Sequence, residues 1–178
     1  MMRLFTLLVG GCLMACAGDP PAQAMEVGQA RELIAQQRDL TAIPRETWQQ
    51  MLTPQQFDIL WNAATERPHT GALLHNKAEG VYVTAGCRLP VFDSRHKYDS
   101  GSGWPSFWDS LYKENIVLKK DFSWGMRRVE ILSACGEHLG HVFEDGPNPT
   151  GLRYCINSAA LEFIPQPVVE TSATEDPR

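Results

Sequence analysis

A short segment near the carboxyl end, Arg153-Tyr154-Cys155-Ile156-Asn157, has the residue types needed for thiol chemistry. Residues two apart in a strand share a face, so Arg153, Cys155 and Asn157 would point the same way. A thiol between a cation and an amide donor is placed to become a thiolate, the nucleophilic form. A lone cysteine is more often a buried core residue, and the polar neighbours favour the functional interpretation.

Two histidines, His138 and His141, precede this segment. A spacing of three could bring both imidazoles to one side of a helical turn as metal ligands, with Cys135 and Glu137 as candidates for further positions. Gly140 between the histidines indicates instead a turn that enters a strand. The spacing therefore leaves three roles open: metal ligands, catalytic acid or base, and structural histidines.

Trp104 follows a loop rich in Gly and Ser and precedes Pro105. Its ring could form the wall of a site for a soft methyl–sulfur group, because sulfur makes favourable contacts with aromatic rings. The alternative is that Trp104 anchors the loop in the core.

Short runs of β-branched and aromatic residues, separated by Gly, Pro, Asp and Asn, predict the elements that would position these groups. The runs lie at 81–84, 116–118 and 129–132. The pattern predicts a mainly β fold of antiparallel strands, because strands do not alternate with long helices.

Two short helices are expected before the strands. One lies at 31–38, and the other begins at Thr53, where Pro54 suits the first helical position and Gln56 can complete a capping box. The second helix has an apolar face formed by Phe57, Leu60, Trp61 and Ala64.

The composition is that of one globular domain with appendages: 178 residues, a formal net charge of −5 and 43% hydrophobic residues. Lys and Arg form no stripe, so nucleic acid is not an expected partner. Of five cysteines, Cys12 and Cys16 lie in the amino-terminal segment. The remaining three are an odd number, which indicates a free, reactive thiol in an exported protein.

The amino terminus has the pattern of an export signal: Arg3, then an apolar run to about Met14, far shorter than the ~20 residues of a membrane span. The sequence 13–16 (Leu-Met-Ala-Cys) is similar to a bacterial lipobox, in which Cys16 would be lipidated. We therefore expect a lipoprotein anchored in the cell envelope and facing the periplasm, with no other membrane contact. The alternatives are a secreted or soluble periplasmic protein with Cys16 incidental, or lipidation at Cys12, a weaker site.

These observations divide the chain into four parts. Residues 1–15 are the expected lipoprotein signal peptide and 16–30 a linker rich in Ala, Gly, Pro and Gln. Residues 31–164 form the expected catalytic domain, and 165–178 a disordered tail.

Several segments occur in order along the second half of the chain. They are Gly80-Val-Tyr82, Lys97-Tyr-Asp-Ser-Gly101, Gly103-Trp-Pro-Ser-Phe107, Arg128-Val-Glu-Ile131, His138-Leu-Gly-His-Val-Phe143, Asp145-Gly-Pro147, Thr150-Gly151 and Arg153-Tyr-Cys-Ile-Asn-Ser158. With these segments, residues from about Thr65 to Ile164, some 100 of 178, resemble the B-type methionine sulfoxide reductases, that is, the methionine-R-sulfoxide reductase family. The resemblance implies two antiparallel β-sheets, in a tent-like arrangement, with short helices on the N-terminal side.

The resemblance also implies a mechanism. The thiolate of Cys155 would attack the sulfur of methionine-R-sulfoxide, free or in proteins, and become a sulfenic acid. His138 and His141 would protonate the sulfoxide oxygen, with Asn157 orienting. The implied substrate-binding residues are Trp104, Phe143 and Arg153.

The sequence departs from the family at the position of the resolving cysteine in many members, which is Ser102 here. Serine cannot form the disulfide that discharges a sulfenic acid. We therefore expect an external thiol reductant, similar to thioredoxin or glutaredoxin. The rival is that Cys87 or Cys135 moves to resolve Cys155.

A second departure concerns zinc, which many members bind through two C-x-x-C pairs. Here Thr84 and Cys87 stand for the first pair, and Cys135 remains of the second, in a segment one residue shorter near Ser133. Tetrahedral zinc needs four ligands, so no metal is expected. Cys87 and Cys135 would instead form a disulfide, whose loop closure could stabilise the fold by roughly 4 kcal/mol.

Two other function classes fit the sequence less well. A zinc-bound structural or interaction module would not need the combination of Cys155, His141 and Trp104. A thiol peroxidase or disulfide oxidoreductase is disfavoured because the chain has no C-x-x-C motif.

Overall fold

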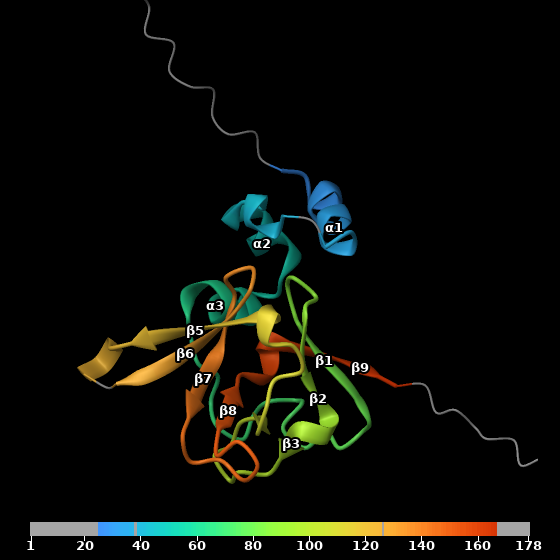
Figure 1. The fold of residues 1–178 in the computed structure, drawn as a ribbon. Coiled ribbons are helices and arrows are strands. Elements are labelled where there is room, and N and C mark those ends of the chain that lie inside the picture. Colours follow the sequence, from blue (N-terminus) through green and yellow to red (C-terminus); the bar gives the residue numbers. More distant parts are fainter. Residues whose placement is uncertain (1–24, 38, 126, 167–178) are drawn as a thin grey trace, which may run out of the picture.

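The computed structural model describes residues 25–37, 39–125 and 127–166. Within these residues three short α-helices precede nine β-strands, and every strand pairing is antiparallel. The strands form two sheets, with the helices gathered on one side of them (Figure 1). The predicted fold class is confirmed: mainly β, two antiparallel sheets, short N-terminal helices.

The helices that precede the strands are α1 (Val27–Ala35), α2 (Arg45–Met51) and α3 (Pro54–Asn62). The predicted start of α3 is confirmed, because Thr53 and Gln56 form a reciprocal capping box. The predicted linker 16–30 is wrong in its last residues: α1 starts at Val27, and Ala30 is fully buried in the helical core. None of the described helices is long and apolar enough to cross a bilayer.

The first sheet has the order β2-β1-β9. It consists of β1 (Gly80–Thr84), β2 (Pro90–Asp93) and β9 (Leu161–Pro165). Pro165 pairs with Gly80, so the tail predicted from residue 165 begins inside a strand. The rest of that tail from 167, the signal segment and the lipidation candidate Cys16 lie outside the described residues.

The second sheet has the order β3-β4-β8-β7-β6-β5. The strands predicted at 116–118 and 129–132 lie within β5 and β6, as 81–84 lies within β1. The strands are β3 (Lys97–Tyr98), β4 (Ser106–Phe107), β5 (Ile116–Asp121), β6 (Arg128–Ser133), β7 (His138–Phe143) and β8 (Arg153–Ile156). Single-turn 3-10 helices η1 to η5 occupy Leu40–Ala42, Ser94–His96, Lys113–Asn115, Ser123–Gly125 and Ser158–Ala160.

An aromatic core joins the two sheets. Phe92 of the first sheet stacks on Phe107 of the second, with ring centroids 4.4 Å apart. Tyr82 meets Phe107 edge-on at 5.0 Å, and Phe92 meets Tyr154 at 5.8 Å. Rings in such arrangements add to the stability gained from burial alone. Tyr154 is thereby fixed in the core, which turns its neighbour Cys155 to the opposite face of β8.

A second, smaller core lies between the helices and the β1–β2 turn. It contains Ala30 and Ile34 of α1, Trp48 of α2 and Cys87 of the turn. Trp48 stacks on Trp61 of α3 with centroids 5.4 Å apart. The N-terminal helices therefore cover the turn that carries Cys87.

Candidate active site

The strand register places the expected chemistry on one face of the second sheet. Cys155 of β8 is opposite Ser106 of β4 and His141 of β7, and His141 is opposite Glu130 of β6. Residues directly opposite in an antiparallel pair project to the same face. These four side chains thus form a row across the sheet, on the face away from the aromatic core.

A β-bulge brings His138 to the same face as His141. In a regular strand, residues three apart point to opposite faces. Here Leu132 of β6 pairs with His138 while the preceding residue pairs with Gly140, so Leu139 is an extra residue and the alternation shifts by one. The two imidazole rings consequently lie 5.5 Å apart, on the same strand face.

Gly140 at this bulge has no room for a side chain. A Cβ at this position would lie 2.1 Å from the carbonyl oxygen of Cys155. The absence of a side chain lets β7 approach β8 closely enough to set His141 beside Cys155.

A pocket of about 120 Å³ opens on this face. Five of the predicted site residues meet there: the nucleophile candidate Cys155, the acid His141, the orienting Asn157 and the aromatic walls. Arg153 flanks the pocket, with its guanidinium 4.4 Å from the centre of the Phe143 ring. The lining residues are Thr65, Trp104, Arg128, Gly140, His141, Phe143, Cys155 and Asn157.

His138 is not part of the pocket wall. It is buried behind it, and its Nδ1 lies 2.8 Å from Glu130 Oε1, while Nε2 has no hydrogen-bond partner among the described residues. Burial lowers the pKa of His138, against the opposing effect of Glu130. His138 therefore lies edge-on to the His141 ring, with ring centroids 5.5 Å apart, and does not line the pocket.

His141 is held by a carboxylate from the hairpin of β5 and β6. Its Nε2 lies 2.9 Å from Asp121 Oδ2, and the same oxygen accepts a 2.8 Å bond from Arg128. Hydrogen bonds from Ser123, then those of His141 and the charge of Arg128, hold the pKa of Asp121 well below its usual range. Asp121 is therefore an ionised partner that fixes the His141 ring and can pair with its protonated form.

The resting thiol of Cys155 differs from the sequence-based expectation. Burial raises the pKa of the Cys155 thiol, and the nearby Ser102 hydroxyl and Arg153 guanidinium lower it only in part. Arg153 is engaged elsewhere, since its Nε and Nη2 donate to Asp145 at 2.8 and 2.9 Å. The expected cation is thus present but largely neutralised, and the protonated thiol is favoured until something else stabilises the anion.

Glu66 positions two walls of the pocket at once. Its backbone N–H donates to Asn157 Oδ1 at 3.0 Å, and its carbonyl accepts from Trp104 Nε1 at 3.1 Å. Its buried carboxylate accepts from the N–H groups of Ser158 and Ala159, the start of η5. The Asn157 amide also donates to the carbonyl of Leu139, so both of its ends are anchored by backbone.

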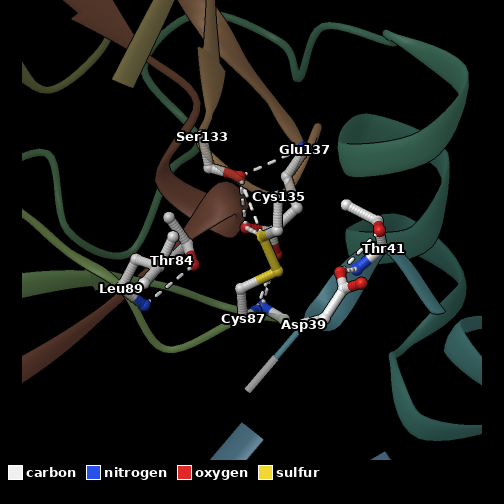
Figure 2. The surroundings of a disulfide bond; sticks show 9 residues. Asp39, Thr41, Thr84, Cys87, Leu89, Ser133, Cys135 and Glu137 are labelled. Carbon is white, nitrogen blue, oxygen red and sulfur yellow. Dashed lines mark hydrogen bonds between the residues drawn. A yellow bond between two sulfur atoms is a disulfide. The ribbon is translucent and has the colours of Figure 1, made fainter. Parts of the chain in front are cut away.

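The other two cysteines form a disulfide away from the pocket. The Cys87–Cys135 bond joins the β1–β2 turn to the β6–β7 turn, with Cα atoms 6.8 Å apart. Figure 2 shows Glu137 and Ser133 beside it. Glu137 is fully buried and its Oε1 accepts from the N–H groups of Gly86 and Cys87, both at 2.9 Å. Burial raises the pKa of Glu137, and its hydrogen bonds oppose this.

The residues around this disulfide do not fit a zinc ion. The possible ligand atoms within 4.8 Å of one another come from Cys87, Cys135 and Glu137. Two of these are sulfurs bonded to each other, whereas tetrahedral zinc needs four free ligands. Ser133 does not complete a set, because its hydroxyl donates to Glu137 Oε2 at 2.9 Å.

The two cysteine regions lie at different levels of the second sheet. Cys135 precedes His138, the first residue of β7, whereas Cys155 is opposite His141. A strand advances about 3.3 Å per residue, so about 10 Å of β7 separates the two positions. An exchange between Cys135 and Cys155 would therefore require a large movement of the turn that carries Cys135.

Several residues of the site are not predicted by the sequence patterns. Arg128 and Glu130 belong to a segment that resembles the family, and their spacing of two places both on one face of a strand, but the resemblance implies no role for them. Asp121 stands at the end of a strand predicted to stop at 118, so its partnership with His141 was not foreseen. Glu66 acts mainly through backbone atoms, for which the sequence carries no signal.

The SelR domain family matches residues 52–165, more than half of the chain. A peptide methionine sulfoxide reductase MsrB from Leptospira interrogans is 58% identical over 120 residues, covering 66% of this chain and 91% of that protein. Its namesake from Methanosarcina barkeri is 52% identical over 119 residues, covering 66% and 84%. The MsrB of Escherichia coli K12 is 55% identical over 113 residues, covering 63% and 82%.

The chain belongs to the methionine-R-sulfoxide reductase family. The family predicted from the sequence segments is thereby confirmed. Every residue that lines the pocket falls inside the matched range 52–165. The helices α1 and α2 precede the range matched by the family model and pack near Cys87.

Proposed function

We propose that this protein reduces methionine-R-sulfoxide to methionine, with Cys155 as the nucleophile. The observation that carries the proposal is the meeting of three features in one pocket: the Cys155 thiol, His141 paired with Asp121, and an aromatic wall. The names of the relatives, peptide methionine sulfoxide reductases, support the same reaction.

The pocket suits the end of an oxidised methionine side chain. Trp104 and Phe143 offer apolar surface to the methyl–sulfur group, and sulfur packs well against aromatic rings. The pocket, of about 120 Å³, is a small hollow that can take the end of one side chain. The sulfoxide oxygen would then point toward His141, and the sulfur would face Cys155.

The thiolate of Cys155 attacks the sulfoxide sulfur, and the S–O bond breaks as the oxygen passes to Cys155. His141, when protonated, donates one N–H to Asp121 and has the other for the sulfoxide oxygen, on which negative charge develops. The products are methionine and a Cys155 sulfenic acid. His138 and Asn157 keep His141 and the pocket wall in place.

Recycling then uses external thiols. A first thiol condenses with the sulfenic acid, releasing water and forming a mixed disulfide, and a second thiol restores Cys155. A protein of the thioredoxin or glutaredoxin class supplies them. The Cys87–Cys135 disulfide takes no part in this cycle, and no zinc is needed; elemental analysis of the purified protein should find well below one zinc per chain.

The proposed location is the cell envelope, where the protein would repair oxidised methionine residues. The support is the apolar run and lipobox-like residues 13–16 of the sequence. Mass spectrometry of the mature amino terminus tests this: lipid on Cys16 is expected, and an unmodified chain that begins beyond Cys16 would indicate secretion instead.

The activity is tested by reduction of the two epimers of dabsyl-methionine sulfoxide with dithiothreitol. The wild type should reduce the R epimer and leave the S epimer essentially untouched, since each epimer has its own enzyme class. Cys155→Ser should abolish reduction even with excess dithiothreitol. The double variant Cys87→Ser/Cys135→Ser is the matched control and should retain turnover while folded. Near-normal turnover by Cys155→Ser would refute the proposal.

A further inference from the structure

A chain of three serine hydroxyls ends at the Cys155 thiol. Ser102 Oγ lies 3.8 Å from Cys155 Sγ, a long contact to a sulfur atom. Ser102 Oγ is 2.8 Å from Ser100 Oγ, which is 2.7 Å from Ser106 Oγ. The far end is a backbone carbonyl, because Ser106 Oγ lies 3.2 Å from the oxygen of Trp104. Each of the four side chains carries one proton that can be donated along this chain.

The chain is built into the fold at both ends. Ser106 is fully buried and stands directly opposite Cys155 in the β4–β8 pair. The loop that carries the other serines is fastened at Gly103, whose carbonyl accepts from His69 N–H at 2.8 Å. Gly103 has a φ of +93° and no room for a Cβ against Pro68, so the turn is fixed. The hydroxyls are therefore positioned before any substrate arrives.

Two hydrogen-bond directions are open to this chain. With Cys155 protonated, S–H donates to Ser102, Ser102 to Ser100, Ser100 to Ser106, and Ser106 to the Trp104 carbonyl. With Cys155 ionised, every hydroxyl can turn round, so that Ser102 donates to the thiolate and each following serine donates to the one before it. In the second arrangement only the carbonyl loses a donor, and the anion gains one, which is the stronger bond.

We propose that Ser102, Ser100 and Ser106 form a reversible hydroxyl chain that stabilises the Cys155 thiolate, and that Ser102 is a positioning residue of the nucleophile. Ser102 stands where many family members carry the resolving cysteine, and the proposal gives this serine the role of a hydrogen-bond donor to the thiolate. It rests on the proposed function in one respect, that the thiolate of Cys155 is the reacting species. The proton leaves to water in the pocket, because the carbonyl at the far end of the chain cannot take it.

Other groups facing Cys155 explain why such a donor matters. His141 of β7 stands opposite it, and Arg153 is the nearest cation but is paired with Asp145. Tyr98 of β3 lies on the same face and is within electrostatic range. Arg128 of β6 also lines the pocket, but its Nη2 is bonded to Asp121. The Ser102 hydroxyl is a neutral donor that lies 3.8 Å from the sulfur.

The test measures the pH dependence of Cys155 alkylation by iodoacetamide, without substrate, with the Cys155 peptide identified by mass spectrometry. Ser102→Ala should slow alkylation about tenfold at a fixed pH below the inflection, and should move the inflection to higher pH. Ser100→Ala should move the inflection in the same direction by a smaller amount, since it removes the second hydroxyl of the chain. Ser102→Thr, which keeps a hydroxyl, should restore the wild-type profile.

Ser94→Ala is the matched control, because the Ser94 hydroxyl accepts from Gly80 N–H outside the pocket, and it should leave the profile unchanged. An unchanged profile in Ser102→Ala, or an equal shift in Ser94→Ala, would overturn the proposal. Ser102 and Ser100 lie on a loop and are only partly buried, so their variants are expected to fold; unchanged thermal melting verifies this. Alkylation needs no sulfoxide. A protein with the predicted shift but no reductase activity would therefore refute the proposed function and still support the hydroxyl-chain proposal.

Discussion

The two cysteine regions of this protein have different surroundings and opposite chemistry. At Cys155 the neighbours are a histidine, an arginine and a hydroxyl chain, and the thiol is free and faces a pocket. At Cys87 and Cys135 the neighbour is the buried carboxylate of Glu137, and the sulfurs are joined. A nearby carboxylate disfavours a thiolate, whereas cations and hydroxyl donors favour it.

The two cysteine regions also differ in how far their sulfur atoms are exposed to solvent. Cys87 is fully buried beneath the N-terminal helices, in the core that includes Trp48. Cys155 is partly exposed at the pocket. The disulfide ties the β1–β2 turn to the turn that precedes β7, while β7 itself carries His141 opposite Cys155. The disulfide-bonded cysteines thus lie in turns, one from each sheet, whereas the free cysteine lies in a strand of the second sheet.

The largest effect is expected from His141→Asn, which tests the reactive region alone. Removing the proton donor should lower turnover of the R epimer about 10²- to 10⁴-fold. Alkylation of Cys155 should continue, since the thiol remains in place. His75→Asn, at an exposed position outside the pocket, is the control and should retain turnover. Full activity of His141→Asn would show that another group supplies the proton.

The next largest effect is expected at the Cys87–Cys135 disulfide. The double variant Cys87→Ser/Cys135→Ser removes a cross-link between residues 48 apart, which costs about 4 kcal/mol of unfolding free energy on the chain-entropy model. Urea denaturation followed by tryptophan fluorescence measures this loss. Turnover at temperatures where the variant is folded should persist. A large loss of activity with unchanged stability would assign Cys87 or Cys135 to the catalytic cycle.

Ser102→Cys should give Cys155 an internal resolving thiol in place of the external one, and should leave the Cys87–Cys135 disulfide intact. The side-chain oxygen of Ser102 is 3.8 Å from Cys155 Sγ, so a thiol introduced there is within reach of a sulfenic acid. After one equivalent of substrate, peptide mapping should find residues 102 and 155 cross-linked. A sulfenic acid that persists on Cys155 of this variant would contradict the geometry of the loop.

A smaller effect is expected from Glu66→Gln. The substitution weakens the charge-assisted bonds to the N–H groups of Ser158 and Ala159, at a cost of about 1 kcal/mol. The Glu66 backbone then holds Trp104 and Asn157 less firmly, so KM should rise a few-fold with little change in kcat. Glu79→Gln, at an exposed position, should change neither constant.

The smallest effect concerns pH. Burial raises the pKa of Cys155, so the thiolate is the minor form at neutral pH and its population grows as pH rises. Alkylation of wild-type Cys155 without substrate should therefore increase with pH and level off only above the pKa of an ordinary thiol. A profile that levels off near neutrality would show that Arg153 and Ser102 outweigh burial.

The sequence predicted the fold class, the capping box at Thr53 and three of the strands, because these depend on local patterns that packing reinforces. It also indicated Cys155, through polar neighbours two residues apart on one strand. The sequence predicts the first helix from residue 31, whereas α1 begins at Val27. The residues before 31 have the composition of a linker, and only the structure shows that Ala30 is buried in the helical core.

Other parts of the site depend on contacts between distant segments and could not be read from the sequence. The bulge at Leu139 places His138 and His141 on one face, against simple alternation. Asp121 reaches His141 only because β5 continues past the apolar residues at 116–118. The sequence also favours a thiolate at Cys155 more than the structure does, because burial and the pairing of Arg153 with Asp145 appear only in three dimensions.

The separation of the two regions is tested most directly by a single turnover without reductant. One equivalent of methionine-R-sulfoxide is added, sulfenic acid is trapped with dimedone, and the chain is mapped under non-reducing conditions. The account predicts one methionine released per chain, dimedone on Cys155 and an intact Cys87–Cys135 disulfide. A disulfide between Cys155 and either of the other two cysteines would contradict it.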